Sequence, residues 1–285
     1  MRWMTFKSGG QTSFGYVLSN KEDNKEGEQV VDVAGNGYNS LKHAIAADAL
    51  AALSKVDGKR HSLSDIEYCP VITQPNKILC AGLNYHAHRE ETGRGDGDSK
   101  PTIFTRFAAA QMGHNQPMVR PRESNSLDFE GEIAIIIGKP GRRISQQDAL
   151  DHVAGYSIYN DGSVREWQRF TSQFTPGKNF AATGGFGPWM MTPDEVGDPY
   201  SMHLTTRLNG EVMQDAAASL LIFNFQELIE FCSTWIELEA GDVLVTGTPG
   251  GVGAARKPPV FMDAGDEIEI EVNPIGKLYN KVVVG

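Results

Sequence analysis

Two glutamates in the segment LDFEGEIAIIIG, residues 127–138, are the side chains that most plainly suggest chemistry. Alternate residues of an extended strand share a face, so Glu130 and Glu132 would leave the same face about 6.6 Å apart. Asp128 falls on that face as well, and the branched apolar residues that follow indicate a strand covered on both sides. Two carboxylates cannot both stay ionised in such a place without a cation or a shared proton. The pattern therefore predicts a positive partner for these acids.

A third acid follows in YSIYNDGSVREWQ, residues 156–168, which indicates an apolar strand running into Asn160 and Asp161. An acid at a strand end is well placed to meet the first pair. Three carboxylates and water are hard oxygen ligands, which suit Mg²⁺, Mn²⁺ or Ca²⁺ rather than zinc. From spacing alone, a divalent-metal site and a solvated acidic face remain equally open interpretations.

The elements that must position these acids divide near residue 70. Residues 1–70 indicate a small α+β domain, with two strands around a Gly-Gly turn, a further strand in QVVDVAG and a helix over residues 40–55 that begins at Ser40. Residues 71–285 are dominated by short strands, with a hairpin at Asn209-Gly210 and helices in ISQQDALDHV and LIFNFQELIEFCSTWIEL. Strands do not alternate regularly with helices, so we expect a mixed α/β, β-rich and mostly antiparallel fold.

Composition excludes several classes of protein. The chain has 285 residues and a formal net charge of −10, which argues against nucleic acid as a partner. It contains no apolar run of about 20 residues, and its first residues do not resemble a signal peptide, so no membrane partner is expected. The three cysteines lack a CxxC pair, which suits a reducing compartment. We therefore expect a soluble, cytoplasmic protein.

Other residues become candidates through their chemistry. Lys178, in PGKN, is a cation near the acids in sequence, and the alternative is an exposed surface lysine. Arg165 and Gln168 follow Asp161 by four and seven residues, so a helix there would place all three on one face. His88 and Glu91, three residues apart in a predicted helical turn, could form a general base, although surface pairing is the commoner role of such a pair.

The segment TGTPGGVG, residues 246–253, contains many glycines but lacks the pattern of a phosphate-binding loop. A turn that aims Thr248 and backbone N–H groups at a substrate carboxylate fits it better. A plain turn is the alternative.

Taken together, several segments resemble the fumarylacetoacetate hydrolase superfamily, and in particular its acylpyruvase and 2-hydroxyhepta-2,4-diene-1,7-dioate isomerase branch. The resemblance runs from about Asn76 to the C-terminus, in KILCAGLNYHAH, PTIF, LDFEGEIAIIIGK, GYSIYNDGSVREWQ, TPGKN, GFGPW, LNGEVMQD, LEAGDVLVTGTPGGVG and GDEIEIEV. It implies a β-roll catalytic domain over residues 71–285, a small N-terminal domain over residues 1–70, and a homodimer. It also implies a role in the breakdown of aromatic compounds and a bound Mg²⁺ or Mn²⁺, with Ca²⁺ as a substitute in crystals.

The resemblance implies roles residue by residue. It makes Glu130, Glu132 and Asp161 the metal ligands, leaves Asp128 outside the ligand set, and makes His88, Glu91 and Lys178 catalytic, with GRGDGDSKP (residues 93–101) as a hinge that closes the His88–Glu91 helix over the metal. The substrate-binding residues that it implies are Tyr85, Arg106, Arg165, Gln168, Thr248 and Gly250. Arg106 stands where many relatives have lysine, and its guanidinium suggests a substrate with a distal anionic group.

Our leading hypothesis is metal-dependent hydrolysis of a C–C bond in a 2,4-dioxo acid, such as an acylpyruvate or a fumarylpyruvate-like compound. A divalent ion that holds the 2-oxo acid would stabilise the pyruvate enolate left by cleavage, while water activated by His88 and Glu91 attacks the C4 carbonyl. The same enolate arises in an isomerase or tautomerase and in an oxaloacetate decarboxylase, which are the alternatives among enzymes. A metal-stabilised binding protein without turnover is the alternative outside enzymes.

Overall fold

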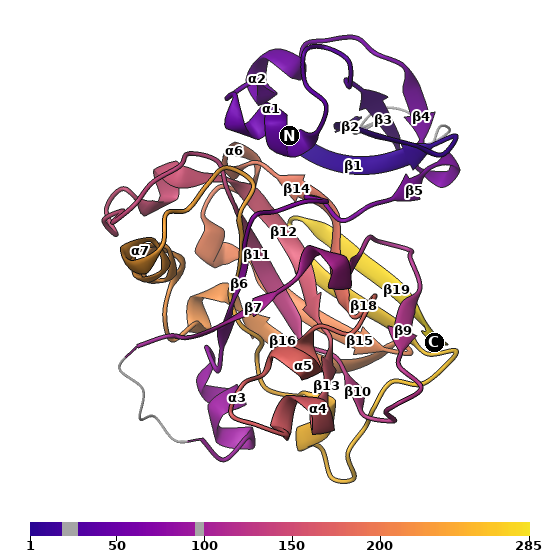
Figure 1. The fold of residues 1–285 in the computed structure, drawn as a ribbon, viewed down its shortest axis with the longest axis vertical. Coiled ribbons are helices and arrows are strands. Elements are labelled where there is room, and N and C mark those ends of the chain that lie inside the picture. Colours follow the sequence, from indigo (N-terminus) through magenta and orange to yellow (C-terminus); the bar gives the residue numbers. More distant parts are fainter. Residues whose placement is uncertain (19–27, 95–99) are drawn as a thin grey trace.

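The computed structural model describes residues 1–18, 28–94 and 100–285, and its core consists of β-strands in two main sheets (Figure 1). Most neighbouring strands are antiparallel, as the sequence predicts, while β14–β8, β17–β6 and β19–β9 are parallel. No helix in the described part of the chain is long and apolar enough to cross a membrane.

The N-terminal part carries the predicted hairpin, with Gly9 and Gly10 at positive φ between its first two strands. The predicted helix over residues 40–55 is instead two short helices, because Asp48 adopts φ +52° and ends the first of them. Ser40 caps the first helix as predicted, by accepting the His43 backbone N–H. The N-terminal elements are β1 (Arg2–Ser8), β2 (Gln11–Leu18), β3 (Gln29–Asp32), α1 (Leu41–Ala46), α2 (Leu50–Leu53), β4 (Arg60–Ser62), a 3₁₀ turn (Leu63–Asp65) and β5 (Glu67–Tyr68).

The larger sheet continues through both predicted domains, in the order β4-β3-β2-β1-β14-β12-β11-β17-β6-β7. The junction is the antiparallel pairing of β1 with β14, where Arg2 faces Met191 and Trp3 faces Met190. The two segments divided at residue 70 therefore share one sheet, and their division into two domains stays a prediction. The remaining strands of this sheet are β6 (Ile78–Gly82), β7 (Thr102–Arg106), β8 (Gln111–Met112), β11 (Gly131–Ile137), β12 (Val153–Asp161), β14 (Gly184–Met191) and β17 (Val243–Val245).

The second sheet has the order β16-β15-β18-β19-β9 and contains the hairpin predicted at Asn209-Gly210, where both residues have positive φ. Its strands are β9 (Met118–Arg120), β15 (His203–Leu208), β16 (Glu211–Ala217), β18 (Glu267–Asn273) and β19 (Gly276–Val284). A short separate pair joins β10 (Leu127–Asp128) to β13 (Ser163–Val164).

Strand β11 is buried along its whole length, as the sequence of residues 127–138 predicts. Ile133 and Ile135 belong to a core cluster that includes Leu204 of the second sheet. Ala134 and Ile136, on the other face, belong to a cluster shared with N-terminal residues. The segment that carries the two glutamates is therefore held between two hydrophobic layers.

The helices lie around the sheets, and α3, α4 and α5 gather at the end of the molecule away from the N-terminal part (Figure 1). The α-helices are α3 (His86–Glu91), α4 (Arg165–Arg169), α5 (Thr175–Lys178), α6 (Pro193–Val196) and α7 (Phe225–Trp235), and the remaining 3₁₀ turns are Ala108–Ala110, Ala149–His152, Pro199–Ser201, Ala218–Leu220 and Gly253–Ala255. The amphipathic helix predicted in residues 221–238 is confirmed as α7, which begins with a capping box formed by Asn224 and Glu227.

Two further helix predictions differ from the structure. ISQQDALDHV forms only a turn and the 3₁₀ segment Ala149–His152, because Ser145 bonds to Asp148 in a tight turn and the chain enters β12 directly at Val153. The helix expected from Asp161 onward begins instead at Arg165, so Asp161 is the last residue of β12. Most of the predicted hinge segment, residues 93–101, lies outside the described residues.

Candidate metal centre and active site

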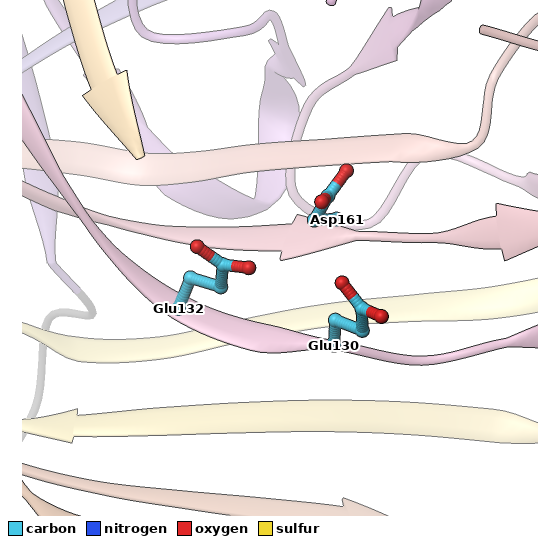
Figure 2. Close-up of side chains that lie close together, drawn as sticks. All are labelled: Glu130, Glu132 and Asp161. Carbon is cyan, nitrogen blue, oxygen red and sulfur yellow. The ribbon is translucent and has the colours of Figure 1, made fainter. Parts of the chain in front are cut away.

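The three acids converge from two neighbouring strands. Glu130 precedes β11, Glu132 lies within it, and Asp161 ends β12, which pairs antiparallel with β11. The Asp161 backbone N–H donates to the Glu130 carbonyl at 2.9 Å, which places the three side chains beside one another (Figure 2). One ligand atom from each carboxyl group lies within 4.8 Å of the others, and all three residues are buried.

Local packing explains the glycine between the glutamates. A Cβ on Gly131 would lie 2.2 Å from Thr206 Oγ1, so any side chain there would push β11 away from β15. The backbone of this segment is held by side-chain amides: Asn160 Oδ1 accepts the Glu130 N–H at 3.1 Å, and Gln214 Oε1 accepts the Gly131 N–H at 2.9 Å. The orientation of the two carboxylates therefore depends on contacts from distant parts of the chain.

Cationic side chains surround the acids but do not reach all of them. Lys178 Nζ lies 2.6 Å from both Glu130 Oε2 and Asp161 Oδ2. Arg165 bridges Glu130 (2.6 Å) and Asp128 (2.7 Å), and Arg106 pairs with Asp161 at 2.6 Å. Within the part of the chain that the structure describes, Glu132 is the one acid of these four without a cationic partner, and its carboxylate accepts the Gly247 N–H. With Lys178, Arg106 and Arg165 charged, the four carboxylates leave one uncompensated negative charge.

The pKa shifts follow from this arrangement. Burial, together with the nearby Asp161 and Glu130 carboxylates, raises the pKa of Glu132 well above its ordinary value. Burial acts in the same direction on Glu130, but the charges of Lys178 and Arg165 outweigh it and bring the pKa of Glu130 below its ordinary value. For Lys178, burial lowers the pKa while Asp161 and Glu130 raise it by more, so the net shift is upward and the ammonium stays charged.

These residues fit a divalent cation. All three groups are hard oxygen donors. An ion such as Mg²⁺ with oxygen ligands at about 2.1 Å brings any two of them within about 4.2 Å of each other, so small side-chain movements are sufficient. The uncompensated charge at Glu132 is what a bound cation would neutralise.

The acids open into a cavity of about 480 Å³ that reaches the surface. Eight of the twelve site residues predicted from the sequence line it: His88, Glu91, Glu130, Glu132, Arg165, Gln168, Lys178 and Thr248. Part of the cavity wall is apolar and consists of Val252, Ala254 and Ala255, and another part is aromatic and consists of Phe104 and Phe174.

The predicted pair His88–Glu91 is formed, with His88 Nδ1 and Glu91 Oε1 2.7 Å apart. Glu91 Oε2 also accepts the Gly251 N–H at 2.7 Å, and Gly251 has φ +105°. The glycine-rich segment thus positions the glutamate of helix α3, a contact that the sequence interpretation did not include. Thr248 Oγ1 accepts from Gln214 Nε2 at 2.7 Å and donates to the Gly131 carbonyl at 3.0 Å, so much of its bonding capacity is already used.

The other four predicted residues are not among the cavity-lining ones. Asp161 lies fully buried behind Lys178 and Arg106. Tyr85 is buried at the start of α3. Gly250 packs against Ala87, whose Cβ lies 3.0 Å from where a Gly250 side chain would begin.

Arg106, the fourth of these residues, lies against Asp161. Its guanidinium donates to Asp161, to the Gly162 carbonyl and to Thr183, and it is buried. The guanidinium faces the carboxylates from behind and is not among the residues that line the cavity, so its expected contact with a distal substrate anion stays a prediction.

Asp128, which the sequence placed on the face of the two glutamates but outside the ligand set, accepts from Arg165 and from the Gly253 and Ala254 N–H groups at 2.7, 2.8 and 2.9 Å. Sequence reasoning missed Gln214, and no local signal could have found it, since its partner Gly131 is 83 residues away.

A comparison with known proteins identifies the class to which this fold and site belong. Residues 77–283 match the family described as fumarylacetoacetate (FAA) hydrolase C-terminal, and the chain belongs to this family. The resemblance inferred from the sequence and the expected fold class are thereby confirmed.

Individual relatives within this family include named enzymes. The chain is 42% identical over 225 residues to the oxaloacetate tautomerase YisK of Bacillus subtilis, covering 78% of this chain and 75% of that protein. It is 40% identical over 222 residues to the mitochondrial oxaloacetate tautomerase FAHD2A of Bos taurus, covering 77% and 70%. Among solved structures, a fumarylacetoacetate hydrolase of Exiguobacterium antarcticum matches with a TM-score of 0.85 and 33% identity over 100% of both chains. A 2-hydroxyhepta-2,4-diene-1,7-dioate isomerase of Mycobacterium marinum matches with a TM-score of 0.81 and 30% identity, covering 100% of this chain and 98% of that chain.

Proposed function

We propose that the protein is a divalent-metal-dependent tautomerase that interconverts the keto and enol forms of a 2-oxo acid, with oxaloacetate as the first substrate to test. The observation that carries the proposal is that His88, held at Nδ1 by Glu91, lines the same cavity as Glu130 and Glu132. The relatives at 40–42% identity are named oxaloacetate tautomerases, whereas the hydrolase at 33% is more distant. This support favours tautomerisation over the hydrolysis that we expected first.

The metal site is part of the proposal. Glu130, Glu132 and Asp161 would hold Mg²⁺ or Mn²⁺, which when bound supplies a Lewis acid that withdraws electrons from the 2-oxo group. Because the carboxylates and cations of the cluster sum to one negative charge, a divalent ion would make the sum positive. A positive pole at the floor of the cavity suits an anionic substrate.

Proton transfer falls to His88. Its Nδ1 is occupied by Glu91, so Nε2 is the nitrogen that can take the C3 proton of the keto form. As the C3–H bond breaks, its electron pair moves into the C2–C3 bond and charge develops on the C2 oxygen. Delivery of the proton to that oxygen completes the exchange, and no other reactant is consumed.

Two cations would hold the substrate during this transfer. Lys178 stays protonated, so it acts as a hydrogen-bond donor to a substrate oxygen and not as the base. Arg165 lines the cavity, and its Nη2 is buried without a hydrogen-bond partner in the described residues. That N–H group can donate to the substrate carboxylate next to the 2-oxo group.

The test follows the decay of enol-oxaloacetate by ultraviolet absorbance in the presence of Mg²⁺ and, separately, of a chelator. We expect metal-dependent acceleration that Glu132→Gln and His88→Gln each reduce at least a hundredfold, since general acid–base catalysis contributes about 10²–10⁴-fold. A matched control is His203→Gln, at an exposed histidine paired with Asp215 outside the cavity. Equal rates with and without metal, or in wild type and His88→Gln, would refute the proposal.

Hydrolysis of a 2,4-dioxo acid is the second candidate, because a histidine held by a carboxylate can also activate water. Proton NMR of acetylpyruvate with Mg²⁺ separates the two: acetate and pyruvate appear only if the C–C bond is cleaved. The same spectra, recorded with oxaloacetate, report pyruvate if the reaction is decarboxylation. Absence of turnover with all three reactions would favour the binding-protein alternative.

The oligomeric state and the cellular location of the protein are also proposals. We propose a homodimer, supported by large exposed apolar side chains such as Phe107 and Phe170, which are 55% and 63% exposed. Light scattering that gives the mass of one chain would contradict it. We also propose a cytoplasmic location, which fractionation of the source cells would test.

A further inference from the structure

Four backbone N–H groups in residues 247–254, which we call the donor loop, donate to acids of the site. The bonds join Gly247 to Glu132, Gly251 to Glu91, and both Gly253 and Ala254 to Asp128. One loop therefore contacts a proposed metal ligand, the partner of the proposed general base and the partner of Arg165. The position of this loop bears on all three.

The first half of the donor loop is fixed by Gln214, a side chain of β16 that is 1% exposed. Its Nε2 donates to Thr248 Oγ1 at 2.7 Å and to the Pro249 carbonyl at 2.9 Å. Its Oε1 accepts the N–H of Gly131, the residue before Glu132 in β11. Both N–H groups of this amide and its oxygen are thus used, so the loop is tied to β11 as far as Pro249.

The contact with the general base lies beyond these bonds, at Gly251. Gly251 has φ +105°, and a residue without a side chain turns readily about its backbone bonds, so the direction of its N–H group needs an external support. That N–H group donates to Glu91 Oε2 at 2.7 Å, and Glu91 Oε1 lies 2.7 Å from His88 Nδ1. The orientation of Gly251 therefore affects the orientation of the histidine ring.

Arg256 holds Gly251 on β16. Its Nε donates to the Gly251 carbonyl at 3.2 Å, and its Nη2 donates to the Met213 carbonyl at 2.8 Å. A Cβ on Gly251 would lie 2.1 Å from the same Met213 oxygen, so the two backbones are in contact there. Arg256 is half-buried and is not among the residues that line the cavity. Two adjacent N–H groups of its guanidinium thus clamp two stretches of backbone together.

We propose that Arg256 is a positioning residue for the general base. By fixing the Gly251 carbonyl on β16, it directs the Gly251 N–H group to Glu91, and Glu91 in turn orients His88. The inference rests on the proposed function, in which His88 Nε2 takes the C3 proton of the substrate.

The loop has two separate anchors, which makes the effect of Arg256 selective. Gln214 binds the loop before Gly251, so the Gly247 N–H group should stay at Glu132 when the arginine is lost. Arg256→Met removes the donors and keeps an unbranched apolar side chain. We expect Mg²⁺ affinity and KM for oxaloacetate to stay unchanged while kcat falls about tenfold, the factor that one hydrogen bond to a charged group is worth.

A double-mutant cycle with Glu91→Ala tests the proposal, with the decay of enol-oxaloacetate as the assay. If Arg256 acts through Glu91, Arg256→Met should lower kcat about tenfold in the wild-type chain and cause no further loss in Glu91→Ala. Arg256→Lys keeps the charge without the fork, so its kcat should fall between the two, and it takes the place of Arg256→Met in the cycle if that variant does not fold. The matched control is Arg142→Met, because Arg142 also binds a backbone carbonyl, that of Thr234, outside the cavity.

Two measurements without turnover accompany the cycle. Calorimetric titration with Mg²⁺ should give the same affinity for wild type and Arg256→Met. Amide hydrogen exchange, followed by mass spectrometry, should be faster in residues 250–254 of Arg256→Met and unchanged in Arg142→Met.

The outcomes separate this inference from the function on which it rests. Unchanged kcat in Arg256→Met, an equal loss in both backgrounds, or a fall in Mg²⁺ affinity that matches the fall in kcat would each overturn the positioning role, while metal-dependent turnover by wild type leaves the proposed function standing. If wild type does not turn over oxaloacetate, the proposed function fails and the positioning role fails with it.

Discussion

Replacing Glu132 by glutamine should stabilise the metal-free protein while abolishing its stabilisation by metal. Glu132 is buried, lies beside Glu130 and Asp161, and has no cationic partner in the described part of the chain. A glutamine side chain has nearly the same shape as glutamate and can still accept the Gly247 N–H, but it removes the repulsion between the Glu132 carboxylate and those of Glu130 and Asp161. One pKa unit corresponds to about 1.4 kcal/mol, so a gain of at least about 1 kcal/mol in the free energy of unfolding is expected. For a chain of this size that is roughly 2–4 °C in Tm.

The neighbouring Glu130 provides a matched contrast of opposite sign. It pairs with Lys178 and Arg165, so Glu130→Gln leaves each of these two buried cations with one carboxylate partner. Breaking a buried ion pair costs about 3–5 kcal/mol. Because each cation keeps one carboxylate partner, we expect the free energy of unfolding to fall by about 3 kcal/mol, at the lower end of this range. Two substitutions two residues apart should therefore shift the metal-free Tm in opposite directions.

The assay is thermal unfolding with a chelator and with saturating MgCl₂. At a metal concentration of 100 Kd, wild type should gain about 2.7 kcal/mol, and both variants should lose most of that gain. Destabilisation of the metal-free protein by Glu132→Gln, or a full Mg²⁺ shift in that variant, would refute the argument that the uncompensated charge belongs to a metal ligand.

Three further predictions concern the surroundings of the site. Gly131→Ala should lose about 1–3 kcal/mol, because its Cβ would lie 2.2 Å from Thr206 Oγ1, and Thr206→Ala should restore part of the loss in chemical denaturation. Asp128→Asn should lower kcat/KM for oxaloacetate and cost about 2–4 kcal/mol, since all its described partners are donors; unchanged kinetics would contradict a positioning role through Arg165. Burial lowers the pKa of His114 from 6.5 to about 4, so the folded protein holds it neutral and stability should fall as pH drops from about 6.5 to about 4. His114→Asn, which keeps an acceptor for the Tyr279 N–H, should reduce that acid sensitivity by up to about 3 kcal/mol in pH-dependent unfolding.

The acidic site was predictable where the information is local. Alternation in residues 127–138 places Glu130 and Glu132 on one face, and the three-residue spacing of His88 and Glu91 brings them together on one helical turn. The sequence placed Asp161 at a strand end where it could meet the glutamates, but the family resemblance was needed to make all three metal ligands, because strand spacing alone does not determine which strands pair.

What could not be predicted depends on contacts between distant segments. Arg106 is turned towards Asp161 because β7, at the edge of the sheet, brings its last residue behind the end of β12. Gly251 reaches Glu91 across 160 residues, and no spacing rule anticipates that bond. The helix expected over residues 40–55 failed for a local reason, since Asp48 adopts a left-handed conformation that helix propensity does not predict.

The junction between β1 and β14 has a consequence for how the chain is made. Arg2 leaves the ribosome near the start of synthesis, but its partner Met191 follows roughly 10–40 s later at about 5–20 residues per second. During that interval the N-terminal hairpin presents an unpaired edge, which invites association with other nascent chains. Chaperones that bind the nascent chain and cover this edge should therefore raise the yield of native protein more than chaperones that act after the chain is released. The delay between the synthesis of β1 and of β14, as well as the stability of the folded protein, then decides what fraction of the chains form the complete sheet.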